Sequence, residues 1–218
     1  MDAYSAVVGF FQDGGAFMYP IVVVLTLGVA IALERWLYLS AADLTNRRVW
    51  KQLMPMVKAR RYQEALQAAS NSRASLGSLL AYGLSRLGTA RRRDDIEKAM
   101  EESLLEVLPR LEKRTHYVAT FANMATLLGL LGTIMGLIKA FTAVSAANPA
   151  DKADLLSASI SVAMNTTAFG LMAAIPLLLA HTILQSKTTS IVDGLEMAAV
   201  KFANAVTEPA QARADASG

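Results

Sequence analysis

Two apolar stretches of the sequence carry small and hydroxyl side chains where a lipid-facing helix would carry Leu or Ile. They are residues 127–136, LLGLLGTIMG, and residues 165–176, NTTAFGLMAAIP. In hydrocarbon, small residues allow two helix backbones to approach closely, and hydroxyl groups bond between helices or line a polar path. These residue types therefore predict close helix packing or a polar path within a membrane.

The candidates fall on defined helix faces. Three glycines of the first stretch share one face at spacings of three and four, with Thr133 beside it. In the second stretch, a narrow stripe of small residues adjoins a polar edge formed by Ser159 and Thr166. If the helices enclose a polar path or channel, we expect it to be lined by Thr133, Ser159, Asn165, Thr166 and Thr167. We expect the helices to pack through Gly129, Gly132, Gly136, Ala163, Gly170, Ala174 and Pro176.

Two alternatives stay open at these positions. The hydroxyl of Thr133 can bond back to its own helix, and the stripe of small residues can serve packing alone. Pro176 lacks a backbone N–H, and we expect it to bend its helix.

The distribution of charge predicts three membrane spans. The chain has 218 residues, of which 54% are hydrophobic and 18% charged, which is unusual for a soluble protein. Three stretches lack Asp, Glu, Lys and Arg, and each has the roughly 20 residues that a spanning helix needs. They are residues 14–33, 115–138 and 155–186. The fold class is therefore an all-α membrane protein, with transmembrane helices at residues 17–39, 115–144 and 155–184.

Basic residues predict the orientation of the chain. Of the 21 Lys and Arg residues, 16 lie between Glu34 and Arg114, whereas residues 1–16 contain none. Because basic residues favour the cytoplasmic side, we expect residues 1–16 outside and residues 40–114 as a cytoplasmic helical domain. With no basic region before it, the first span is expected to be a retained anchor and not a cleaved leader.

The remaining segments follow from the same orientation. The loop at residues 145–154 is expected outside, and residues 185–206 continue the third span as a cytoplasmic helix. The second span is likewise expected to extend into the cytoplasmic domain. Residues 207–218, rich in Ala and small polar residues, are expected to be a disordered tail.

Helical patterns also occur between the first and second spans. We expect helices around residues 49–57, 62–69 and 76–87. A longer helix is expected to begin at Asp94 and to run through Lys113 into the second span.

Charged residues lie at the end of the first span. Arg35 is expected to extend toward the membrane surface beside Trp36 and Tyr38, which suit an aromatic belt. The functional alternative is that Glu34 belongs to a cytoplasmic proton exit.

The residues that are missing exclude several kinds of site. The chain has no Cys and only two His, which excludes thiolate chemistry and weighs against a protein metal site. No catalytic or phosphate-binding motif occurs, so we expect neither an enzyme nor a cofactor. The net charge of +3 follows membrane topology and does not indicate nucleic acid. The second and third spans contain no carboxylate, so a proton conductor of this kind needs one from another subunit.

Residues 129–141, GLLGTIMGLIKAF, and 159–176, SISVAMNTTAFGLMAAIP, resemble the MotA/TolQ/ExbB proton channel family. The similarity covers nearly the whole chain, and three spans are similar to the ExbB/TolQ-like branch. Two positions depart from the family pattern: Thr126 stands where many relatives have Pro, and Val162 stands where ExbB proteins often have Glu.

The resemblance implies a homopentamer in the bacterial inner membrane. This pentamer would enclose a dimer of a single-span partner, ExbD or TolR, whose membrane Asp carries the proton. Thr133 and Thr167 would face the channel, with Thr166 adjacent. The proton-motive force would then drive rotation and energise a TonB or TolA effector. The expected function is an ExbB-like stator for TonB-dependent outer-membrane transport; the alternatives are a TolQ-like subunit of the Tol-Pal system and a structural membrane scaffold.

Overall fold

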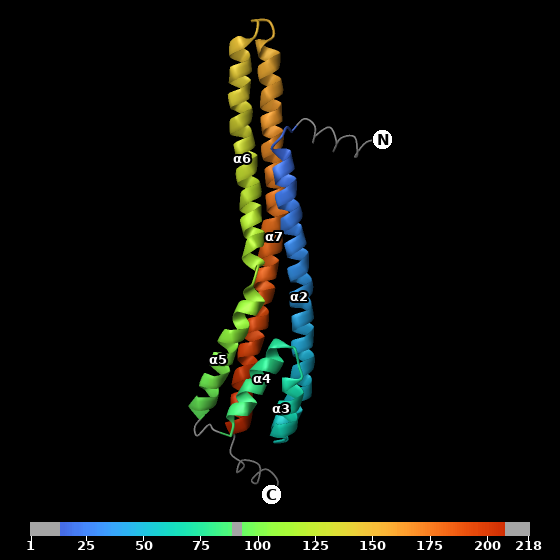
Figure 1. The fold of residues 1–218 in the computed structure, drawn as a ribbon, viewed down its shortest axis with the longest axis vertical. Helices are drawn as coiled ribbons and strands as arrows, with labels where there is room; N and C mark the ends of the chain where they lie inside the picture. Colours follow the sequence, from blue (N-terminus) through green and yellow to red (C-terminus); the bar gives the residue numbers. More distant parts are fainter. Residues whose placement is uncertain (1–13, 89–92, 208–218) are drawn as a thin grey trace, which may run out of the picture. The chain divides into compact units, whose positions relative to one another are not determined.

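The computed structural model describes residues 14–88 and 93–207, and within them it contains helices, turns and no strand. The helices are labelled in Figure 1. They are α2 (Met18–Lys58), α3 (Tyr62–Ser70), α4 (Ser75–Arg86), α5 (Arg93–Glu112), α6 (Thr115–Ala146) and α7 (Lys152–Thr207). The expected all-α class is confirmed.

Three helical stretches are long and apolar enough to cross a membrane. They are Met18–Lys58, Arg93–Ala146 and Lys152–Thr207, with 41, 54 and 56 residues. Since about 20 residues cross the hydrocarbon core, each stretch is much longer than a membrane requires. The expectation of three spanning helices is confirmed.

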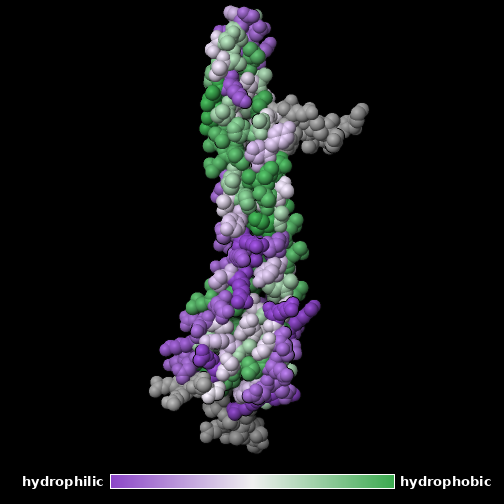
Figure 2. Space-filling model, in the orientation of Figure 1, coloured by the Kyte–Doolittle hydropathy of each residue, from purple (hydrophilic) through white to green (hydrophobic). Residues whose placement is uncertain are grey.

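The chain divides into two compact units, to which α2 and α7 both contribute. Unit 1 consists of Met1–Arg35 and Arg114–Leu184, and unit 2 of Trp36–Lys113 and Gln185–Gly218. The division lies close to the ends of the charge-free stretches. Figure 2 shows hydrophobic residues gathered over the long helices of unit 1 and mostly hydrophilic residues over unit 2.

Small residues dominate the interior of unit 1. Ala122, Ala125, Ala163, Ala173 and Ala174 are all buried. Many of the larger apolar side chains of these helices point outward, among them Leu127, Ile138, Phe141, Met164 and Ile175, although Met18, Ile21, Leu177 and Leu184 are buried. This is the reverse of a soluble protein and matches helices whose outer faces contact lipid or another subunit.

Unit 2 has an interior of large side chains. Phe202 of α7 is fully buried, and it lies against Gly83 of α4 together with Met100 of α5. Leu79 and Leu80 of α4 are fully buried in the same unit. Buried positions of α4 and α5 recur every three or four residues, which is the spacing that makes one helix face apolar.

Two expectations about helix boundaries need correction. Residues 49–57 are not a separate helix but the end of α2, which continues to Lys58. The helix expected to run from Asp94 through Lys113 into the second span is interrupted, because α5 ends at Glu112 and α6 begins at Thr115. Arg114 adopts a left-handed backbone with φ 66°, a conformation that costs about 1 to 2 kcal/mol for a residue with a side chain.

Candidate functional site

The glycine face of α6 packs directly on the backbone of α7. A Cβ atom placed on Gly129 would lie 3.2 Å from the Cα of Gly170 and 3.3 Å from the Cα of Thr167. One placed on Gly170 would lie 2.7 Å from the carbonyl oxygen of Ala125. Since backbone atoms cannot move aside as a side chain can, only glycine fits at this crossing.

The other packing candidates extend the same interface. A Cβ on Gly136 would lie 2.8 Å from the Cβ of Ala163, and one on Gly132 would overlap the side chain of Thr166. Ala163 and Ala174 are buried, whereas Pro176 is exposed and lies within α7, which continues through it without interruption.

Two hydroxyl groups meet across the glycine contact. The Oγ1 atoms of Thr133 and Thr167 lie 3.2 Å apart, and both side chains are half-buried. The Thr133 hydroxyl lies 2.6 Å from the carbonyl of Leu130, and the Thr167 hydroxyl lies 2.9 Å from the carbonyl of Gly129. The sequence placed these residues on facing stripes of two helices, and the structure brings their oxygen atoms together.

Thr166 has a different environment from its neighbour. It is 2% exposed, and its hydroxyl donates to the carbonyl of Gly14 at 2.6 Å or of Val162 at 3.0 Å. Within one chain it therefore joins α7 to the segment that precedes α2. Ser159 and Asn165 are half-buried on α7, and in the described residues no hydrogen bond links either to the Thr133–Thr167 pair.

A polar cluster ties the end of the charge-free part of α2 to the start of α6. Arg35 is 3% exposed and donates from Nε to the hydroxyl of Thr115 at 3.3 Å. Glu34 is about half exposed and lies 3.7 Å from the guanidinium of Arg114. The Arg35 side chain is enclosed between two helices of unit 1, and its reach toward the membrane surface stays a prediction.

Sequence reasoning missed the Arg35–Thr115 contact. The available signal was that Arg35 follows the first charge-free stretch and Thr115 opens the second. Ends of neighbouring spans on the same side of a membrane come close in space, so a pairing there was open to prediction. The cluster also provides partners for the left-handed residue Arg114 and for Thr115 directly after it, which stabilises the break between α5 and α6.

The described parts of the spans offer no titrating carboxylate between Thr115 and Ile138 or between Leu155 and Ser186. Within residues 14–88 and 93–207, no cluster of three or more His, Cys, Asp or Glu residues is placed to hold a metal ion. This site provides hydroxyl groups, backbone carbonyls and close-packed glycines. Such groups accept and donate hydrogen bonds but do not store a proton at neutral pH.

Comparison with known proteins gives one family. A family model described as the MotA/TolQ/ExbB proton channel family matches residues 71–197, more than half of the chain, and includes every site residue on α6 and α7. A search of curated proteins gives no match.

Proposed function

This chain belongs to the MotA/TolQ/ExbB proton channel family, and on that premise we propose that it is the stator and channel subunit of a proton-driven motor. The proposed motor lies in a bacterial inner membrane and is ExbB-like. It energises TonB-dependent outer-membrane transport together with an ExbD-like partner. The observation that carries this proposal is the Thr133–Thr167 hydroxyl pair, held between two helices without a carboxylate.

The hydroxyl pair suits brief contact with a titrating group. Each threonine has one O–H donor and two lone pairs, and each hydroxyl has a backbone carbonyl within reach. With both protons on those carbonyls, lone pairs remain to accept from water or from a protonated carboxyl. When a carboxylate passes, a hydroxyl can turn from its carbonyl and donate to it instead. Neither exchange requires a helix to move.

The proton carrier of this proposal comes from a second protein. A pentamer of this chain encloses a dimer of single-span partners, each of which supplies a membrane Asp. One elementary charge that crosses 100 mV releases about 2.3 kcal/mol, enough to bias a rotation step. Because a rigid glycine contact holds α6 to α7, such a step moves the partner against the helix pair instead of separating the pair.

The proposed topology follows the basic residues. Residues 1–16 and 145–154 lie in the periplasm, and residues 40–114 and 185–218 lie in the cytoplasm. In this orientation Glu34, beside Arg114, lies at the cytoplasmic end of the first span and is a candidate for the proton exit.

Replacement of one hydroxyl distinguishes a channel from a scaffold. We expect Thr167→Val to lower partner-dependent proton flux about tenfold, since a hydrogen bond to a charged group contributes about 1.5 to 3 kcal/mol. Thr167→Ser keeps the hydroxyl and should retain most of the flux. Thr182→Val is the matched control, because Thr182 lies on the same helix and its exposed hydroxyl bonds back to Leu178. Equal flux in all three variants would favour the scaffold.

A TolQ-like role in the Tol-Pal system is the alternative within the same mechanism. The two roles share the site and differ in the effector. A gene for an ExbD-like protein beside TonB would favour the proposal, whereas neighbouring Tol components would favour the alternative.

A further inference from the structure

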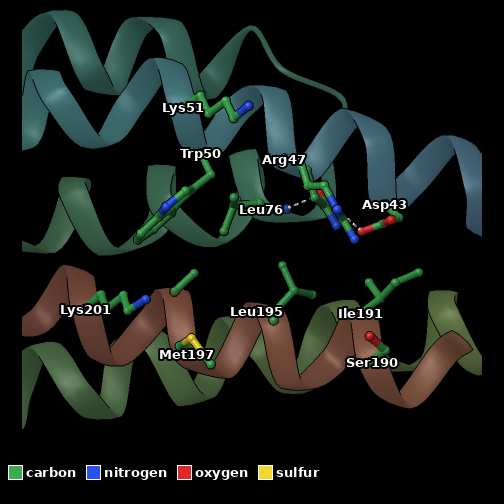
Figure 3. A pocket seen from close by; sticks show the side chains of 13 residues that line it. Asp43, Arg47, Trp50, Lys51, Leu76, Ser190, Ile191, Leu195, Met197 and Lys201 are labelled. Atoms are coloured by element: carbon green, nitrogen blue, oxygen red, sulfur yellow. Dashed lines mark hydrogen bonds and ion pairs between the residues drawn. The ribbon is translucent and has the colours of Figure 1, made fainter. Parts of the chain in front are cut away.

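Unit 2 has a hollow lined by basic residues, shown in Figure 3. Its volume is about 360 Å³, and α2, α4 and α7 contribute to it. We call it the basic pocket: its cations are Arg47, Lys51 and Lys201, and its apolar wall includes Leu76 and Leu195. Within the described residues Arg47 is paired with Asp43 at 3.0 Å, whereas Lys51 and Lys201 have no ion pair.

A buried amide in the basic pocket lacks a partner. Asn46 is 8% exposed and lines the pocket. Its Oδ1 accepts from the backbone N–H of Leu76 at 3.1 Å, but no atom of the described chain accepts from its Nδ2. An unpaired buried donor costs about 1 to 3 kcal/mol. The Nδ2 atom is itself enclosed, so a partner reaches the pocket through its two lysines, which favour an anionic group.

A second hollow of unit 2 has the opposite charge. It lies between α5 and α7, and its volume is about 370 Å³. We call it the acidic groove: its carboxylates are Glu97, Glu101 and Glu196, and its apolar residues include Leu105 and Val200. Glu97 is paired with Arg93 at 2.6 Å, whereas Glu101 and Glu196 have no ion pair among the described residues. Leu105 and Val200 are 63% and 57% exposed.

The two hollows share α7 and lie at overlapping heights along it. Residues 190–201 line the basic pocket together with α2, and residues 196–203 line the acidic groove together with α5. At a rise of about 1.5 Å per residue, the centres of the two sets differ in height by only about 6 Å. A head-to-tail contact closes into a ring only when the rotation from one copy to the next divides a full turn, and a small difference in height between the two faces is the second condition, which these faces meet.

We propose that the acidic groove of one copy of this chain docks against the basic pocket of the next copy, and that repetition of this contact closes the ring. This inference rests on the proposed function, which requires a homo-oligomer, and adds which faces meet. Two lysines without an ion pair then face two glutamates without one, and Leu105 and Val200 leave solvent. A small anion in the basic pocket is the rival occupant, and it would leave those two apolar side chains exposed.

Charge reversal tests the pairing. We expect Lys51→Glu with Lys201→Glu to weaken ring formation, and Glu101→Lys with Glu196→Lys to do the same. All four changes together restore complementarity and should restore the ring mass measured by native mass spectrometry. Lys58→Glu with Lys98→Glu is the matched control, because both lysines are exposed in unit 2 and lie outside the two hollows. A fourfold variant no better than either half would overturn the inference.

The fourfold variant also tests mixing between subunits. Co-expressed with the unaltered chain under a different tag, it should form separate rings, because each mixed contact places like charges together. We expect mixed rings to fall at least roughly tenfold below the random proportion, since like-charge contacts cost several kcal/mol. Random mixing of the two chains would contradict the proposed contact. It is also the result expected if a small anion, and not a second copy, occupies the pocket.

Crosslinking provides a measurement that does not depend on charge. The chain has no cysteine, so single cysteines can be introduced without a background. Chains carrying Lys51→Cys and chains carrying Glu101→Cys should crosslink when mixed, and neither should crosslink to itself, because a head-to-tail contact never pairs a residue with its own copy. Self-crosslinking of either variant would overturn the inference. Proton flux is measured separately: charge-matched rings without partner-dependent flux would contradict only the proposed function.

Discussion

Different kinds of contact stabilise the interior of each of the two units. In unit 1, α6 and α7 meet through glycines whose backbones touch and through hydroxyl groups, while many Leu, Ile and Phe side chains point outward. In unit 2, α4, α5 and α7 enclose Phe202, Met100 and two leucines, and hydrophilic residues cover the outside (Figure 2). Within a single chain, the surroundings of each unit determine which side chains stabilise it.

The physical reason is the solvent. Lipid tails are as apolar as leucine, so burial of a leucine between membrane helices adds little, and close backbone packing and hydrogen bonds become decisive. In water, burial of a large apolar side chain contributes about 1.5 to 3 kcal/mol. The same change should therefore have different consequences in the two units.

Removal of the largest core side chain of unit 2 should have the largest effect. Phe202→Ala leaves a cavity and should lower the free energy of unfolding by about 3 to 5 kcal/mol. Hydrogen exchange should rise in α4 and α5 and stay unchanged in α6. Leu44→Ala, which truncates an exposed side chain of α2 in the same unit, is the control. An equal rise of hydrogen exchange in both units would show that the Phe202 core does not stabilise unit 2 separately from unit 1.

Addition of one methyl group in unit 1 should have the next largest effect on stability. Gly170→Ala places a Cβ 2.7 Å from the carbonyl oxygen of Ala125 and should cost about 1 to 3 kcal/mol. Gly88→Ala is the control, because nothing lies within 4 Å of its added Cβ and it lines neither hollow of unit 2. Thermal unfolding in nanodiscs measures both variants. Equal tolerance of the two would contradict the backbone contact.

Loss of one buried hydroxyl should have a smaller effect. Thr166→Val keeps the shape of the side chain but removes the donor to Gly14, at a cost of about 1 kcal/mol. Thr166→Ser retains the donor and loses a methyl group. If the Val variant proves as stable as the original and the Ser variant does not, the methyl contact with Gly132, and not the hydrogen bond, stabilises this joint.

The exposed ion pair at the end of unit 1 should matter least. Glu34→Gln removes the charge opposite Arg114, and because both side chains are about half exposed, the loss should stay below about 1 kcal/mol. High salt should abolish the difference, since salt screens exposed charges. A larger loss that persists in high salt, measured by denaturant titration, would indicate a stronger role for this cluster.

Much of this fold followed from the sequence because charge segregation is a strong signal. The three spans and the spacing of Gly129, Gly132 and Gly136 were predictable from period and composition alone. The break at Arg114 was not, because a left-handed residue without glycine depends on partners that only the folded chain supplies. The environment of Thr166 was also beyond prediction, since its partner Gly14 lies 152 positions away.

The central claim, that this chain conducts protons only with a carboxylate supplied by another protein, is tested most directly by proton flux into proteoliposomes. The chain alone should give no flux above empty vesicles, and addition of the ExbD-like partner should open the path. Replacement of the membrane Asp of that partner by Asn should close the path again. Robust flux from the chain alone would contradict the claim and would direct attention to Glu34 and to His181, a half-buried residue of α7.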